Sequence, residues 1–163
     1  MELNFTKMQG AGNDYLYLDC RRTGLPPDAA ALAVQLSRRH YSVGADGVIY
    51  LCPPLLADGD ATMRMFNADG SEGAMCGNGV RVFVDHLRRE GLVDLPVGQT
   101  LDVVMRGGIK RVTPEADDEG AGARYRVDMG AAASPARETI EVRIPGIEQV
   151  LGGIWVDMPN PHT

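Results

Sequence analysis

The sequence is poor in the residues that hold disulfide-rich proteins or zinc sites together. It contains only three cysteines, Cys20, Cys52 and Cys76, an odd number at wide and irregular spacing. Such a set does not form a disulfide framework, and none of the three belongs to a Cys-x-x-Cys pair. The three histidines are just as scattered. The sequence therefore shows no zinc signature, and we expect no metal site.

Basic charge and long apolar runs are also lacking. The formal net charge is −6, whereas a nucleic-acid partner would call for a basic face. No apolar run approaches the length that spans a bilayer, and no basic segment followed by an apolar stretch opens the chain. We therefore expect no nucleic-acid partner, no membrane partner and a cytoplasmic location. A small anionic ligand remains compatible with this charge, because backbone amides at a helix start bind carboxylates.

The 163 residues, 44% of them hydrophobic, suffice for one domain or one lobe of a larger protein. Apolar spacing predicts two helices, at residues 28–39 with Asp28 as N-cap and at about 77–90. Strands are predicted at residues 3–8, 15–19, 47–52, 61–66, 100–105, 108–113, 124–129, 139–144 and 153–158. We expect a longer loop between the first two strands and an exposed acidic loop at 115–122. This order indicates an α+β or mixed α/β fold without the steady βαβ alternation of dinucleotide-binding proteins.

The segment that carries chemistry is glycine-rich and ends at the second predicted helix. Cys76 directly precedes that helix, where the positive end of the helix dipole and unpaired amides favour a thiolate. The amides of Gly77, Asn78 and Gly79 can hold a carboxylate there, since two of these residues have no side chain. A thiolate beside a bound α-carboxylate can remove or return the neighbouring α-proton. The alternative is a small, buried, inert cysteine.

Five segments, in this order, resemble the first half of diaminopimelate epimerases. They are FTKMQGAGND at 5–14, VGADG at 43–47, MFNADGSE at 65–72, MCGNGVR at 75–81 and MPNPH at 158–162. The resemblance implies that residues 1–163 form a single N-terminal lobe in which a mixed β-sheet wraps around a central helix, at about 77–90. It also implies an isomerase of lysine biosynthesis that interconverts LL- and meso-diaminopimelate with two cysteines and no cofactor.

The resemblance also assigns roles to single residues. Cys76 matches the first-lobe acid/base, and His162 matches the histidine that tunes thiol protonation. The positions that match substrate-binding residues are Asn13, Asn67, Gly77, Asn78 and Asn160. Three of these have structural alternatives, because Asn13 follows a Gly-Ala-Gly turn, Asn67 can cap a loop and Asn160 lies between two prolines.

The sequence departs from the family pattern at two points. Gly47 stands where the family often has a glutamine, so that a side-chain contact is lost or replaced by backbone. A second Cys-Gly motif is absent, and Cys20 and Cys52 are interpreted as packing residues. We therefore expect the second lobe to be missing from this chain, the isolated chain to be inactive or nearly so, and a partner lobe or a homodimer to complete it.

Other interpretations remain open at this stage. Proline racemases and hydroxyproline epimerases carry a histidine where Asn78 stands, and phenazine-type isomerases use a carboxylate in place of the thiol. From another class, the chain is a non-catalytic module that binds an amino acid, or one half of a split enzyme. Binding without turnover would support the module, and activity restored by a second lobe would support the split enzyme.

Overall fold

The computed structural model describes residues 3–54, 60–116, 122–131, 139–146 and 148–154. The chain divides into two compact units, Met1–Met129 and Gly130–Thr163, and each is considered by itself. In the second unit, strands β8 (Thr139–Val142) and β9 (Leu151–Ile154) pair antiparallel. The prediction that residues 1–163 form one lobe stays a prediction.

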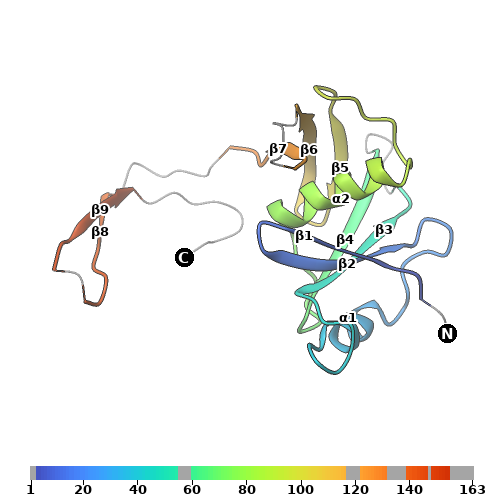
Figure 1. Cartoon of the computed structure of the whole chain (residues 1–163), viewed down its shortest axis with the longest axis horizontal. Helices are drawn as coiled ribbons and strands as arrows, with labels where there is room; N and C mark the ends of the chain where they lie inside the picture. Colours follow the sequence, from blue (N-terminus) through green and yellow to red (C-terminus); the bar gives the residue numbers. More distant parts are fainter. Residues whose placement is uncertain (1–2, 55–59, 117–121, 132–138, 147, 155–163) are drawn as a thin grey trace. The chain divides into compact units, whose positions relative to one another are not determined.

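The first unit is built on one seven-stranded sheet whose strands follow one another in chain order (Figure 1). These strands are β1 (Thr6–Gly10), β2 (Asn13–Asp19), β3 (Gly47–Cys52), β4 (Ala61–Asn67), β5 (Leu101–Met105), β6 (Gly108–Glu115) and β7 (Arg124–Asp128). Only the β2–β3 and β4–β5 pairs are parallel. Helix α1 (Ala29–Ser37) connects the first parallel pair, and α2 (Gly77–Arg89) connects the second.

The two helices lie on opposite faces of this sheet. Strands β2 and β4 run in opposite directions, so two crossover connections of the same hand carry their helices to opposite sides. Helix α1 packs on β3 and β4, whereas α2 contacts β1 and β2 as well as β6 and β7. Because the strands at both edges of the sheet touch α2, the sheet curves around this helix. The predicted mixed fold with a central helix is confirmed.

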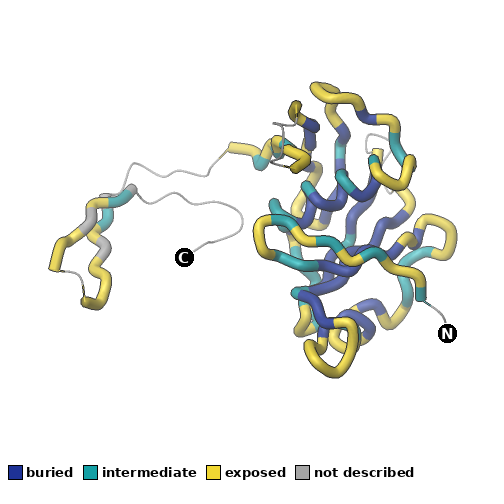
Figure 2. Tube along the Cα trace, in the orientation of Figure 1, coloured by how far each residue is buried: buried dark blue, intermediate teal, exposed yellow. Residues whose placement is uncertain are grey.

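Each face of the sheet carries its own hydrophobic cluster. Along β2 the side chains alternate, so that Tyr15 and Tyr17 join the α2 cluster while Leu16 and Leu18 join the α1 cluster. Figure 2 shows the buried residues concentrated along the central strands and the inner side of α2. The apolar stripe predicted for α2 is buried as expected; its members are Val80, Phe83, Val84 and Leu87.

The first three predicted elements differ from the structure at their ends. Strand β1 begins at Thr6 and joins β2 through a two-residue turn, because Ala11 and Gly12 both adopt positive φ (50° and 89°). Such a turn matches the twist of the flanking strands, so the expected longer loop is wrong. Helix α1 ends at Ser37, two residues before Arg39, since the amides of the returning loop bind its last carbonyls.

The remaining elements mostly follow the predictions. Asp28 stands at the predicted N-cap of α1, but its side chain makes no cap hydrogen bond. Strand β9 begins at Leu151, two residues earlier than predicted, and the rest of the predicted strand lies outside the described residues. Most of the predicted acidic loop at 115–122 also lies outside the described residues.

Within the described part of the chain, no helix combines the length and apolar character needed to cross a membrane.

The buried His86 on α2 gives this unit a pH-dependent stability. Burial lowers the pKa of His86, whose ring lies 5.6 Å from the ring of Tyr17. The unfolded chain binds a proton near pH 6.5, above the folded-state value, so the free energy of unfolding falls as the pH drops below about 6.5. We expect a slope of up to about 1.4 kcal/mol per pH unit in that window, measured by urea denaturation.

The replacement His86→Phe is expected to remove this slope, because the new ring cannot titrate. The control is His40→Gln at an exposed position, which should leave the slope unchanged. A slope that survives in His86→Phe would show that another group is responsible.

Candidate active site

Cys76 is the N-cap residue of α2, where the sequence predicted it. Its backbone is extended (φ −143°, ψ 110°), and its carbonyl accepts the first helical hydrogen bond from the amide of Val80. Cys76 itself is half-buried. The sulfur accepts a hydrogen bond from the amide of Gly79 at 3.2 Å. A sulfur in this place faces the positive end of the helix dipole, which favours negative charge on it.

Strand β2 brings two tyrosines to the first turn of α2. The hydroxyl oxygen of Tyr15 lies 3.6 Å from the sulfur of Cys76, and the hydroxyl of Tyr17 donates to the carbonyl of Gly79 at 3.3 Å. Both rings lie on one face because residues two apart on a strand share a face. The start of the helix and its cysteine are thus held from the sheet side by two hydroxyl groups that the sequence analysis did not identify.

Asn13 and Asn78, two of the predicted substrate-binding residues, are brought together beside Cys76. The amide nitrogen of Asn78 donates to the amide oxygen of Asn13 at 2.8 Å, while Arg81 donates to the side-chain oxygen of Asn78 at 2.5 Å. On its other side, Asn13 donates to the carboxylate of Asp46 at 3.2 Å. Asn13 begins β2 and is not part of the turn. Both amide groups therefore have fixed orientations.

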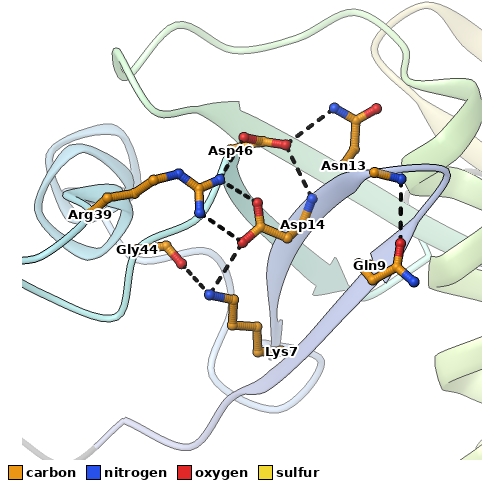
Figure 3. Close-up of polar contacts among 8 residues, drawn as sticks. Lys7, Gln9, Asn13, Asp14, Arg39, Gly44 and Asp46 are labelled. Atoms are coloured by element: carbon orange, nitrogen blue, oxygen red, sulfur yellow. Dashed lines mark hydrogen bonds and ion pairs between the residues drawn. The ribbon is translucent and has the colours of Figure 1, made fainter.

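A network of charged side chains lies behind Asn13 (Figure 3). Arg39 donates to Asp14 and to Asp46, and Lys7 lies 3.2 Å from Asp14. The hydrogen bond from Arg39 holds the pKa of Asp14 below its usual value. Arg39 is half exposed, so these ion pairs add little to stability. Their effect is to orient Asp46, which in turn orients Asn13. Asp46 belongs to the VGADG motif, and that motif was the signal that could have identified it.

The amides at the start of α2 are not all available to a ligand. The Gly79 amide is bound to the Cys76 sulfur, which corrects the expectation that three amides face a carboxylate. Among the described residues, the Gly77 and Asn78 amides have no hydrogen-bond partner. A Cβ on Gly79 would lie 3.1 Å from Ile49 and 3.3 Å from the sulfur, so glycine here lets the amide approach the sulfur closely. Two free amides remain to hold an anionic group.

Asn67 is the last residue of β4. It pairs with Gly47 on β3, which pairs with Tyr15 on β2. At the strand spacing of a sheet this places it about 10 Å from Tyr15 on the α2 face. Its side chain donates to the hydroxyl of Ser71 at 3.0 Å, which is the loop-capping contact considered as the alternative. Its substrate contact stays a prediction.

The structure also shows why glycine occupies position 47. A Cβ there would lie 2.3 Å from the carbonyl oxygen of Phe66 on the paired strand. The space that the family glutamine was expected to fill is therefore occupied by the backbone of β4, and no side chain fits without a shift of that strand.

Cys20 and Cys52 are confirmed as packing residues. Both are buried in the cluster on the α1 face, away from α2. Burial raises the pKa of the Cys20 thiol and raises the pKa of the Cys52 thiol to about 11, so both stay protonated at neutral pH.

Two of the predicted site residues, Asn160 and His162, lie outside the described residues. Within the described ranges, no three His, Cys, Asp or Glu side chains gather as they would around a metal ion.

Sequence comparison finds relatives that carry the same name. A diaminopimelate epimerase of Halothermothrix orenii is 39% identical over 176 residues, covering 100% of this chain and 60% of the relative. One of a Picosynechococcus species is 40% identical, covering 99% of this chain and 59% of the relative. The chain thus spans about 60% of the length of the relatives it matches.

Solved structures of the same fold are more distant in sequence. A protein of Pseudomonas aeruginosa called a predicted epimerase superposes with a TM-score of 0.62 at 15% identity, over 84% of this chain and 46% of the other. A probable proline racemase of Agrobacterium radiobacter superposes with a TM-score of 0.59 at 16% identity, over 88% and 46%. Residues 5–134 match the sequence profile of the family described as diaminopimelate epimerase. This chain belongs to the diaminopimelate epimerase family.

Proposed function

We propose that this chain is the N-terminal lobe of an enzyme that interconverts LL- and meso-diaminopimelate in lysine biosynthesis. The observation that carries the proposal is the Cys76 sulfur at the start of α2, half-buried and hydrogen-bonded by Gly79, next to two unpaired amides. The proline racemase-like alternative is less favoured, because the relatives that cover the whole chain at 35–40% identity are named diaminopimelate epimerases.

The geometry supports a proton transfer at a stereocentre. An α-carboxylate held by the amides of Gly77 and Asn78 has its α-carbon close to the sulfur of Cys76. The thiolate takes the α-proton and becomes a thiol, and the electron pair left on carbon is delocalised into the carboxylate, which the amides and the helix dipole stabilise. A thiol on the opposite face then gives its proton to that carbon and becomes a thiolate. Each turnover inverts the carbon and exchanges the roles of the two sulfurs.

The opposite-face thiol comes from a second polypeptide segment in this proposal. Cys20 and Cys52 are buried on the other side of the sheet and do not reach the substrate. A second lobe therefore completes the site, and the alternative source of the thiol is a second copy of this chain. We place the enzyme in the cytoplasm and propose that it needs no cofactor.

The remaining predicted residues have supporting roles. In the proposal Asn13 and Asn67 contact the substrate from the ends of β2 and β4, together with Asn160. His162 tunes the protonation of the reactive thiol. Asn13 is the best supported of these by position, because its hydrogen bond to Asn78 places it at the start of α2.

The test is reconstitution with the missing part of a relative. This chain is mixed with the C-terminal remainder of the Halothermothrix orenii protein, and complexes that co-elute on size exclusion are given LL-diaminopimelate in deuterated water. We expect meso product carrying one deuterium per inverted centre, and no turnover by this chain alone. Turnover by the isolated chain, or an inactive complex that co-elutes, would contradict the two-lobe proposal.

A further inference from the structure

Tyr15 stands out because its hydroxyl reaches the reactive sulfur from a fixed position. The residue is only 6% exposed, and its strand pairs with Met8 on one side and Gly47 on the other. Strand pairing on both sides therefore fixes the backbone of Tyr15, and burial fixes its ring. Its oxygen lies 3.6 Å from the Cys76 sulfur, within hydrogen-bond range for a sulfur atom. No motif in the sequence analysis includes this residue.

We propose that Tyr15 is a positioning residue that donates its hydroxyl to the Cys76 sulfur and stabilises the thiolate form. The inference rests on the proposed role of Cys76 as the proton-transferring thiol. A thiolate has no proton to give, so when the sulfur is ionised both of its partners, the Gly79 amide and the Tyr15 hydroxyl, donate to it.

The Tyr15 hydroxyl remains protonated at neutral pH. Burial raises the pKa of Tyr15, and its contact with Cys76 acts in the same direction. The carboxylates of Asp14 and Asp46 also act on it electrostatically and favour the neutral phenol. Tyr17, the other tyrosine of this strand, also has its pKa raised by burial. A neutral phenol is therefore available as a donor across the neutral pH range.

A hydroxyl also suits a sulfur that changes its protonation state in every turnover. An amide N–H only donates, so the Gly79 amide favours the thiolate alone. A phenol both donates and accepts, so Tyr15 can accept the S–H of the neutral thiol by rotating its own proton away. The sulfur thus keeps a partner in the same place before and after proton transfer.

The experiment compares Tyr15→Phe with Tyr17→Phe in this chain. Both variants remove one buried hydroxyl from the same strand, but the Tyr17 hydroxyl binds the Gly79 carbonyl instead of the sulfur. The rate of iodoacetamide alkylation at Cys76 is followed from pH 5 to 10 by peptide mass spectrometry, which separates it from Cys20 and Cys52. Thermal unfolding of each variant shows whether the chain is folded.

For Tyr15→Phe we expect the midpoint of the pH–rate profile to rise by about one pH unit, as for loss of one hydrogen bond to a charged group. Thiolate nucleophilicity increases with basicity, so the plateau rate at high pH should rise about threefold while the rate at low pH falls about threefold. Tyr17→Phe should leave the midpoint in place. Crossing profiles of this kind do not arise from a general loosening of the fold.

An unchanged midpoint in Tyr15→Phe, or an equal shift in Tyr17→Phe, would overturn the inference. If Tyr15→Phe does not fold, 3-fluorotyrosine at position 15 keeps the ring and makes the hydroxyl a stronger donor. The midpoint is then expected to move down, and a midpoint that stays or rises contradicts the inference. Alkylation does not require turnover, so this result is independent of the reconstitution test of the proposed function.

Discussion

Cys76→Ser is expected to lower epimerisation by the reconstituted two-lobe complex by about 10²–10⁴-fold while the fold stays intact. Serine fits the extended N-cap backbone of α2 and is a better N-cap residue than cysteine, so the hydrogen bond to Gly79 is retained. A serine hydroxyl does not ionise at neutral pH and cannot take the α-proton. Turnover is measured by chiral separation of the diaminopimelate isomers, and stability by urea denaturation.

Two further variants separate the chemical role of Cys76 from its role as a cap. Cys76→Ala removes both the thiol and the cap, so it should lose the same activity and in addition about 1 kcal/mol of stability. Cys20→Ala removes a buried thiol on the α1 face and should keep the turnover of the folded complex. Wild-type turnover in Cys76→Ser would show that this residue only caps the helix.

The elements with strong local patterns are the ones that could be predicted from the sequence. The run of apolar residues in β3 and the helical stripe of α2 are both found with ends within one residue of those predicted. The first hairpin was predicted with too long a loop, because nothing in the sequence signals that Ala11 adopts positive φ next to Gly12. Helix α1 ends two residues before Arg39 because amides of the loop that follows bind its last carbonyls, which the apolar spacing of the helix does not show.

The candidate site also contains some residues that local sequence predicts and others that it does not. The place of Cys76 follows from a glycine-rich segment ahead of an amphipathic helix, which is local information. Tyr15 and Asp46 depend on the parallel pairing of β2 and β3 across the α1 connection, and the sequence does not encode that register in a readable pattern. The motif around Asp46 was recognised, but its contact with Asn13 required the coordinates.

Phe83→Ala is expected to reduce the free energy of unfolding of the first unit by about 3–5 kcal/mol. Phe83 is completely buried in the middle of α2, against the concave face of the sheet. Truncation removes the transfer energy of the ring and leaves a cavity that strands on both sides cannot fill, because the sheet already curves around the helix. Urea denaturation measures the change, with the exposed Val97→Ala as a control that should stay within about 0.5 kcal/mol.

The loss of stability in Phe83→Ala can also be measured by chemical labelling of the two buried cysteines. Cys20 and Cys52 lie on the opposite face of the sheet from Phe83, so they react with iodoacetamide only when the unit opens as a whole. A loss of about 3 kcal/mol raises the open population about 100-fold, and labelling of both thiols should accelerate by that factor or more. If urea shows the expected loss while the labelling of Cys20 and Cys52 is unchanged, α2 unfolds separately from the α1 face. The sheet with its two helices would then not be one cooperative unit.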